Sequence, residues 1–172
     1  MPDPGLDSVA ESVVRELSRT GATVATAESL TGGLVAAALT SVPGASVAVR
    51  GGVVAYATDL KTSLAGVPAD LLDRSGPVSA ATASAMASGA RRLCDATYGV
   101  ATTGVAGPNW QDGHPPGTLY VAVAGPRGEV TDAPAGLRGD RTAVRNAAVR
   151  CALDLLRRVV AGAAESTPRS QR

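Results

Sequence analysis

The sequence predicts an α/β fold: a single layered α/β/α domain with a mixed, mostly parallel sheet. Segments whose apolar residues recur at helical spacing alternate with short apolar segments that are typical of strands buried on both faces. Two strand-like segments late in the chain flank a tight turn, which favours one antiparallel hairpin. The 172 residues suffice for one core, and we expect a domain over residues 1–164 and a disordered tail over 165–172.

Clear signals bound the first helix and the first strand. Asp3-Pro4 is typical of a helix start and Gly21 of a helix end. The apolar residues between them fall on one helical face, which predicts a helix that covers a sheet. Residues 22–27 (ATVATA) are short and apolar in character, so they predict a buried strand that runs into the turn ESLTGG at 28–33.

A second helix and a long strand follow this turn. Residues 34–42 place their apolar side chains on one stripe, and Pro43-Gly44 marks the helix end. Residues 46–58 (SVAVRGGVVAYAT) form the longest strand-like stretch of the chain. Gly51-Gly52 within this stretch indicates a bulge or the close approach of another backbone.

The middle of the chain predicts three helices and a strand. A short helix is expected from Asp59 to Ala65, and another after Pro68. Ser79 is a typical cap for the Ala-rich helix that reaches about Leu93. Residues 97–107 (TYGVATTGVAG) predict a buried strand that passes into a glycine-bearing loop.

The last part predicts a loop, a hairpin and a long helix. Residues 104–117 are rich in Gly, Pro, Asn and Asp, which are turn formers. Residues 118–125 and those after Gly128 predict a hairpin joined by Pro126-Arg127. Asp140 is the expected cap of a final helix that extends to about Ala164.

Composition and charge argue against several classes of function. A net charge of +1, with three Tyr and one Trp for base stacking, argues against nucleic-acid binding. No apolar run is long enough to span a membrane, and the start MPDPGLDS lacks the basic and apolar parts of a signal peptide. Cys94 and Cys151 stand apart, as expected of small buried side chains in a reducing compartment. We therefore expect a cytoplasmic protein with no membrane or nucleic-acid partner.

Lys61 is the only lysine in a chain that has 15 arginines. A lysine can lose its proton when it is withdrawn from water, whereas an arginine stays charged. Lys61 is therefore a candidate general base, although one solvated lysine would give the same count.

The turn at 28–33 holds a candidate nucleophile, because ligands of open α/β sheets bind beyond the carboxyl ends of strands. Ser29 offers a hydroxyl, and Thr31, Gly32 and Gly33 are expected to contact substrate. Backbone N–H groups near the two glycines could bind a phosphate or hold an oxyanion. The alternative is a plain strand-to-helix turn that Thr31 caps.

A second loop, residues 102–108 (TTGVAGP), also follows a predicted strand with glycines. It offers the hydroxyl of Thr103 and the backbone N–H groups of Gly104 and Gly107. A plain turn, with glycine where a positive φ is needed, is an equally good interpretation.

Tyr56 and Lys61 lie between these loops in sequence and could activate Ser29. A serine needs a base, and lysine serves only where the site keeps it neutral, with the Tyr56 hydroxyl as a possible proton relay. A Ser-His-Asp arrangement is not expected, because the single histidine, His114, stands in a turn-rich loop. We interpret His114 as a surface or lid residue.

Arg141 and Arg145 lie four residues apart in the first turns of the predicted last helix. Cations there oppose the helix dipole at a cost of about 0.3–1 kcal/mol each, which suggests a nearby anion such as a substrate phosphate. Glu28, Asp59 and Asp112 have no recognisable metal-ligand spacing, so we expect neither a metal nor a cofactor.

Three motifs together resemble the C-terminal domain family of the competence-damage protein CinA. They are AESLTGGLVAAALTSVPGAS, GGVVAYATDLK, and TTGVAGP with the downstream PPGTLYVAVAG. They occur in the order typical of the family, and the resemblance runs from about residue 7 to 160, nearly the whole chain. Stand-alone members of the family are known as nicotinamide-nucleotide amidohydrolases.

This resemblance implies hydrolysis of the carboxamide of nicotinamide mononucleotide to nicotinic acid mononucleotide and ammonia, in pyridine nucleotide salvage. It implies that Ser29 is the nucleophile and that Tyr56 and Lys61 activate it. By the same resemblance, the residues at the substrate are Thr103, Gly104 and Gly107, and the phosphate contacts are Arg141 and Arg145. Family members also suggest a homodimer.

The chain departs from the family pattern in three places. The first motif usually reads ESCTGG, whereas this chain has Leu30 at its third position. The loop at 109–116 (NWQDGHPP) differs from the usual glycine-rich form. Larger members also carry a nucleotide-pyrophosphatase domain, so we expect this chain to act without one on an intact mononucleotide.

Two other functions remain open at this point. One is a non-catalytic module that binds a nucleotide or a partner protein in competence or DNA damage. The other is a Ser-Lys amidase for a different small amide.

Overall fold

One five-stranded sheet organises the computed structural model, which describes residues 4–165. The strand order is β2–β1–β3–β4–β5, in which β2, β1 and β3 are parallel and the last two are antiparallel. The strands are β1 Val24–Glu28, β2 Val49–Val54, β3 Tyr98–Gly104, β4 Leu119–Gly125 and β5 Gly128–Asp132. The predicted α/β fold with a mixed sheet is confirmed.

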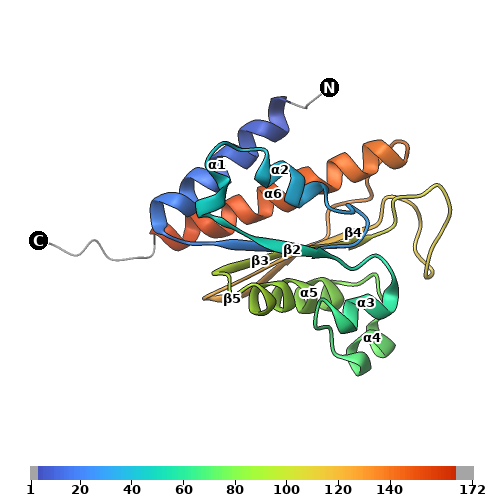
Figure 1. The fold of residues 1–172 in the computed structure, drawn as a ribbon. Coiled ribbons are helices and arrows are strands. Elements are labelled where there is room, and N and C mark those ends of the chain that lie inside the picture. The colour runs from blue at the N-terminus through green and yellow to red at the C-terminus, as the bar shows by residue number, and fades with distance from the viewer. Residues whose placement is uncertain (1–3, 166–172) are drawn as a thin grey trace, which may run out of the picture.

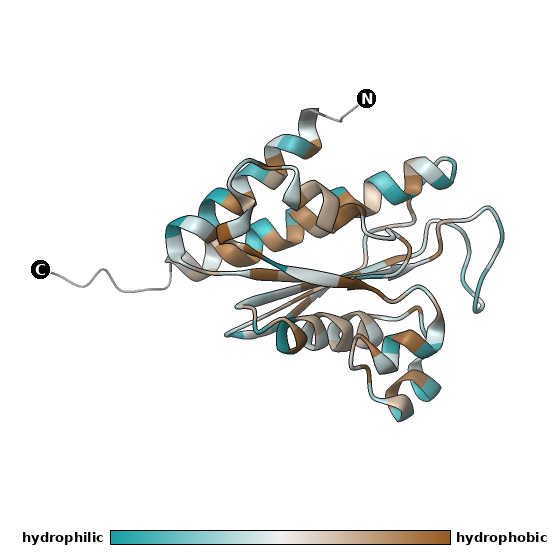
Figure 2. Cartoon of the chain, in the orientation of Figure 1, coloured by the Kyte–Doolittle hydropathy of each residue, from teal (hydrophilic) through white to brown (hydrophobic). Residues whose placement is uncertain are grey.

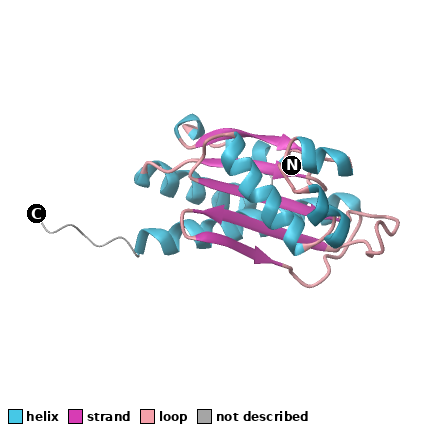
Figure 3. Cartoon of the chain, turned by 90° about the horizontal axis from the view of Figure 1, so that it is seen from below, coloured by secondary structure: helices cyan, strands magenta, loops and turns pink. Residues whose placement is uncertain are grey.

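Helices cover both faces of the sheet (Figure 1, Figure 3). One face carries α1, α2 and α6, while the other carries α5 with the short α3 and α4 near one end. The helices are α1 Pro4–Thr20, α2 Leu34–Thr40, α3 Thr58–Ser63, α4 Ala69–Ser75, α5 Ala80–Leu93 and α6 Arg141–Glu165. None of the helices within residues 4–165 has the length and apolarity to cross a membrane.

The two layers have different cores. Leu and Val side chains dominate the core between the sheet and α1, α2 and α6. The core beneath α5 consists mainly of alanines, and Figure 2 shows this helix as largely pale, whereas brown and teal alternate along α1 and α6. Cys151 packs half-buried against the first core and Cys94 against the second, and neither forms a disulfide. Small side chains let α5 approach the sheet closely.

Several predicted boundaries are confirmed by hydrogen bonds. The Ser79 Oγ accepts the N–H of Thr82 at 3.1 Å at the start of α5. The Asp140 carboxylate likewise accepts the N–H of Ala143 at 2.8 Å before α6. The predicted helix start at Asp3 and residues 166–172 of the predicted tail lie outside the described residues, and Glu165 ends α6.

The strand predicted over residues 46–58 is shorter than expected. A turn of 3-10 helix, η1 (Ala45–Val47), occupies its start, and α3 begins at Thr58. β2 is an edge strand whose only neighbour is β1, and β1 begins at Val24, opposite Val49. Residues before Val49 therefore have no strand with which to pair. The expected bulge is present, because the register with β1 skips Arg50.

The parallel strands position the functional loops. Because β1 and β3 run in the same direction, the turn after Glu28 and the loop after Gly104 leave the sheet at the same edge. The Ser29 N–H donates to the Thr102 carbonyl at 3.0 Å, which extends this pairing by one residue. In Figure 1 the loop between β3 and β4 projects from this edge in yellow.

Candidate active site

Ser29 and Lys61 meet at the carboxyl end of β1, although 32 residues separate them in sequence. Ser29 follows β1 directly, and Lys61 lies on α3. The Lys61 Nζ donates to Ser29 Oγ at 3.1 Å and to the Ala55 carbonyl at 3.1 Å. Both residues are buried, with 8% of Ser29 and 2% of Lys61 exposed. An amine at hydrogen-bond distance from an enclosed hydroxyl can accept its proton when the hydroxyl acts as a nucleophile.

Burial lowers the pKa of Lys61 below its ordinary value of 10.5, because loss of water disfavours the ammonium form. The negative charge of Asp112 acts in the opposite direction and raises this pKa by a smaller amount. The net effect is an amine that releases its proton more readily than an exposed lysine. This is the property that a general base requires.

Glu28, the last residue of β1, caps the N-terminus of α2 with its side-chain carboxylate. Its buried carboxylate accepts three backbone N–H groups, those of Gly33 at 3.0 Å, Val35 at 3.0 Å and Ala36 at 2.8 Å. This cap satisfies the donors that a helix start leaves unpaired. From the sequence, Glu28 was considered only as a metal ligand, and its role as a helix cap was not predicted. The available signal was an acidic residue four positions before Gly32, in the turn that leads into a helix.

The two glycines of the turn determine its backbone shape. Gly32 and Gly33 have φ values of +59° and +97°, which side-chain-bearing residues rarely adopt. The Gly32 N–H donates to the Ser29 carbonyl at 3.0 Å, and Glu28 accepts the Gly33 N–H. The N–H groups of both glycines therefore have acceptors within the turn, and the substrate contacts expected at Gly32 and Gly33 stay a prediction.

Leu30 and Thr31 carry the donors that remain in this turn. Their backbone N–H groups donate to no acceptor within residues 4–165. Leu30 lines the same cavity as Ser29. The Thr31 side chain is not the helix cap, because its Oγ1 shares a 2.7 Å hydrogen bond with Thr102 Oγ1 in the interior. Free N–H groups directly after a serine nucleophile are the usual donors of an oxyanion hole.

Arg145 holds this turn from α6. Its Nε donates to the Leu30 carbonyl and its Nη2 to the Thr31 carbonyl, both at 3.0 Å. The Nη2 lies 3.2 Å from where a Cβ at Gly32 would be, so the guanidinium packs directly on the turn. Arg145 does not line the Ser29 cavity. Within the structure Arg145 thus contacts two backbone carbonyl oxygens, and the anion expected beside it stays a prediction.

Tyr56 and Arg141 form the rim of the cavity. Arg141 donates from Nη2 to the Tyr56 hydroxyl at 2.6 Å and from Nη1 to the Gly107 carbonyl at 2.8 Å. Both residues are exposed. Lys61 reaches Ser29 directly, so the Tyr56 relay is not required by this geometry. Gly107 contributes to the rim through its carbonyl and does not line the cavity.

Thr103 and Gly104 line the cavity from the end of β3. The Thr103 Oγ1 donates to the Pro77 carbonyl at 2.6 Å, which ties β3 to the segment before α5. The enclosed space has a volume of about 30 Å³, which suffices for a water molecule or a small group but not for a nucleotide. A larger ligand must therefore extend past the rim into solvent or displace the rim.

Gln111 and Asp112 are cavity-lining residues that the sequence analysis did not assign to the site. They belong to a tight hairpin in which Gln111 and His114 exchange two backbone hydrogen bonds, of 3.1 and 2.9 Å. The Asp-Gly pair at its tip was a recognisable hairpin signal. His114 is half-buried in this hairpin and does not line the cavity.

Within residues 4–165, no group of three or more His, Cys, Asp or Glu side chains could hold a metal ion.

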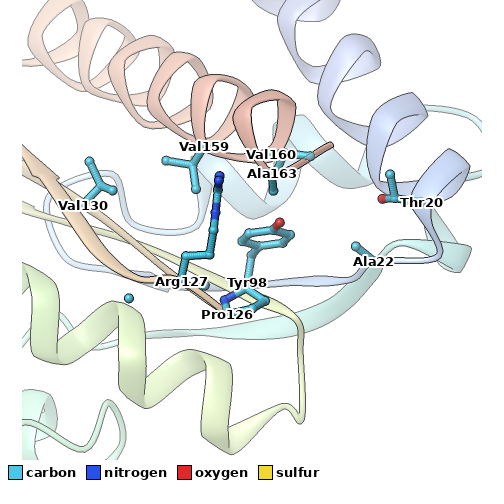
Figure 4. Close-up of a pocket in the computed structure, with 11 residues that line it drawn as sticks. Thr20, Ala22, Tyr98, Pro126, Arg127, Val130, Val159, Val160 and Ala163 are labelled. Atoms are coloured by element: carbon cyan, nitrogen blue, oxygen red, sulfur yellow. The ribbon is translucent and has the colours of Figure 1, made fainter. Parts of the chain in front are cut away.

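A larger cavity, of about 680 Å³, lies at the opposite edge of the sheet. Tyr98 and Arg127 extend across it toward Val159 and Ala163 of α6 (Figure 4). Its lining contains no Ser, Lys, His, Asp or Glu, and so it has no pairing of nucleophile and base. The small cavity, which contains Ser29 and Lys61, is therefore the better candidate for an active site.

Comparison with known proteins agrees with this fold and these motifs. The model of the CinA C-terminal domain matches residues 6–160. The chain belongs to the CinA C-terminal domain family. The resemblance expected from the sequence is thus confirmed.

Relatives within the CinA family are similar over most of this chain. A CinA-like protein of Frankia casuarinae is 54% identical over 156 residues, which are 91% of this chain but 36% of that protein. A CinA-like protein of Anaeromyxobacter dehalogenans is 50% identical over 89% of this chain and 38% of its own length. The chain thus spans little more than a third of these curated relatives.

Solved CinA-family structures share the whole fold. The competence/damage inducible protein CihA of Agrobacterium tumefaciens aligns with a TM-score of 0.88 and 34% identity, over 94% of this chain and 98% of that one. A CinA superfamily protein of Klebsiella pneumoniae aligns with a TM-score of 0.87 and 32% identity, over 91% and 98% of the two chains.

Proposed function

We propose that this CinA-family domain is a serine amidase that hydrolyses the carboxamide of nicotinamide mononucleotide to nicotinic acid mononucleotide and ammonia. The observation that carries the proposal is the buried contact of 3.1 Å between Lys61 Nζ and Ser29 Oγ. The choice of substrate rests on the family motifs. No metal or cofactor is invoked.

In the first half of the reaction, neutral Lys61 accepts the proton of Ser29 as Oγ attacks the carboxamide carbon. The carbonyl oxygen becomes an oxyanion, for which the unpaired N–H groups of Leu30 and Thr31 are the proposed donors. The Lys61 ammonium then passes its proton to the departing nitrogen. The C–N bond breaks, ammonia leaves, and an ester to Ser29 remains.

In the second half, Lys61 accepts a proton from water as the water oxygen attacks the ester. The proton returns to Ser29 Oγ, and the acid is released. One water is consumed for each ammonia produced, so the reaction is balanced.

Arg145 has a positioning role in this proposal. A trans peptide is planar, with its C=O and N–H on opposite sides. By holding the Leu30 carbonyl, Arg145 fixes the plane of the Leu30–Thr31 peptide and with it the direction of the Thr31 N–H. The donor is thereby oriented before the substrate arrives, which is how an oxyanion hole lowers the barrier.

Arg141 is the proposed partner of the substrate phosphate. It lies at the rim and is exposed, and its contacts are the Tyr56 hydroxyl and the Gly107 carbonyl. A substrate whose amide enters the small cavity would leave its ribose and phosphate beside this rim. Arginine suits such a contact because its planar fork matches phosphate oxygens.

The deciding experiment is the release of ammonia from nicotinamide mononucleotide by the purified chain in the presence of a chelator, beside the Ser29→Ala variant. We expect release from the wild type and a loss of at least about 1,000-fold in Ser29→Ala. Wild-type protein that is folded but releases no ammonia would refute the proposal. Saturable binding without release would indicate a non-catalytic module, and release from other amides a different amidase.

A further inference from the structure

The hairpin over the active site holds a carboxylate in a constrained position. Asp112 has a φ of +49° and Gly113 a φ of +78°, and the two form the tip between Gln111 and His114. Two left-handed residues closed by paired backbone hydrogen bonds define a tight turn with little freedom. Asp112 is thus preorganised at the tip, where it lines the cavity of Ser29 and Lys61.

The Asp112 side chain has no hydrogen-bond or ion-pair partner among the described residues. Within residues 4–165 its carboxylate forms neither a side-chain hydrogen bond nor an ion pair, and it is exposed. The other charged groups that line the cavity are Lys61 and Arg141, and Tyr56 is the titratable phenol at the rim. Arg141 donates to Tyr56 and Gly107.

The charge of Asp112 opposes the loss of a proton from Lys61. Its negative charge favours the ammonium form of Lys61, whereas catalysis needs the neutral amine. A positive charge from the substrate would remove this conflict, because it would pair with the carboxylate and also disfavour the ammonium. The ring nitrogen of nicotinamide mononucleotide carries such a charge close to the carboxamide.

We infer that Asp112 is the specificity-determining residue that selects amides attached to a cationic ring over neutral amides. The inference rests on the proposed function and adds the charge state of the substrate to it. Asp112 binds the pyridinium by electrostatic attraction, while Ser29 and Lys61 perform the reaction. The cation in turn offsets the effect of the Asp112 charge on Lys61, so a bound cationic substrate favours the neutral, basic form of Lys61.

The first test compares binding in the Ser29→Ala background, where turnover cannot interfere. The probes are nicotinamide mononucleotide and its 1,4-dihydro form, which keeps the carboxamide, ribose and phosphate but has a neutral ring. We expect Asp112→Asn to weaken binding of the cationic probe about tenfold and of the neutral probe less than about twofold. Asn suits the hairpin because it also tolerates a positive φ.

The matched control is Asp59→Asn on α3. It removes the same charge two residues from Lys61, but Asp59 does not line the cavity. We expect it to change both dissociation constants by less than about twofold. Equal weakening of both probes by Asp112→Asn, or no weakening, would overturn the inference.

The second test is the pH dependence of kcat/KM for nicotinamide mononucleotide. Loss of Asp112 removes the charge that raises the pKa of Lys61 in the free enzyme, so the acidic limb moves to lower pH in Asp112→Asn. Tyr56, Arg141 and Asp59 are unchanged in this variant. An acidic limb that stays in place or moves to higher pH would overturn the coupling between Asp112 and Lys61.

The two proposals can fail separately. If the wild type releases no ammonia, the proposed function is refuted by that result alone. If ammonia is released but the cationic and neutral probes bind Asp112→Asn with the wild-type ratio, only the role of Asp112 is refuted.

Discussion

The two loops that form the candidate active site are built in opposite ways. The turn after β1 is buried and internally bonded: Glu28, Ser29 and Thr31 are 1%, 8% and 0% exposed, and Arg145 clamps its carbonyls. The loop after β3 is exposed from residue 108 to 113, and it carries the chain's only tryptophan, Trp110, with 68% of its surface in solvent.

Under the proposed function, this difference separates the groups that react from the contacts that select the substrate. A nucleophile, its base and its oxyanion donors must keep fixed positions, which requires a packed and fully bonded surrounding. Contacts with the rest of a ligand need access from solvent, and exposed loops provide it. We therefore expect changes in the first loop to lower kcat and changes in the second to alter KM.

The largest effect is expected at Lys61. Both Lys61→Met and Lys61→Arg should lower kcat/KM for nicotinamide mononucleotide by at least about 1,000-fold, because neither side chain can accept a proton. Steady-state ammonia release measures this. An active Lys61→Arg enzyme would mean that a positive charge or a hydrogen-bond donor, and not a base, is needed beside Ser29.

The stability of the protein should depend on pH through the same lysine. Because burial lowers the pKa of Lys61 from 10.5, the unfolded state binds more protons in the interval up to that value. The free energy of unfolding of the wild type, relative to Lys61→Met, should therefore rise with pH through this interval, by at most about 1.4 kcal/mol per pH unit. Below the lowered pKa the difference should be constant. Urea unfolding across pH 7–10 tests this, and parallel curves for the two proteins would contradict it.

Replacement of Arg145 should reduce the rate without weakening substrate binding. We expect Arg145→Met to lower kcat about 10- to 100-fold and to change KM by less than about threefold, because an oxyanion contact forms only in the transition state. Arg145→Lys should recover part of the rate. A raised KM with unchanged kcat would instead support the phosphate contact that the sequence predicted.

In the second loop, Gly113→Ala should show the opposite pattern. A Cβ at this position would meet nothing within 4 Å, so only the φ of +78° opposes the alanine. The strain is about 1–2 kcal/mol and should distort the hairpin, raising KM about three- to tenfold with little change in kcat. Steady-state kinetics measure both constants. A kcat that falls with unchanged KM would place this hairpin with the reaction machinery.

The smallest effect on activity is expected at Leu30, where the family motif usually has cysteine. Its side chain is 3% exposed, belongs to the Leu- and Val-rich core, and lies against Gly104. Leu30→Cys should lower the free energy of unfolding by about 1–2 kcal/mol through lost packing and change kcat/KM less than about threefold. Thermal unfolding and ammonia release test the two effects. A change of substrate preference would show that this position shapes the pocket.

Much of the architecture followed from local signals. The caps Ser79 and Asp140, the helix end at Gly21 and the hairpin around Pro126-Arg127 are local in sequence, and each lies where its pattern predicted it. The start of β2 was misplaced because it depends on the length of the neighbouring strand, and a strand propensity does not contain that information.

The sequence by itself determined the fold class, the family and the candidates Ser29 and Lys61, because periodicity, motif order and the single lysine are properties of the chain. Only the tertiary structure decided what these groups touch: that Lys61 reaches Ser29, that Glu28 caps α2, that Arg145 holds the turn, and that Asp112 lines the site. Contacts across 32 to 115 residues depend on how parallel strands bring their loops to one edge. The pKa of Lys61 depends on burial, which exists only after the chain has packed.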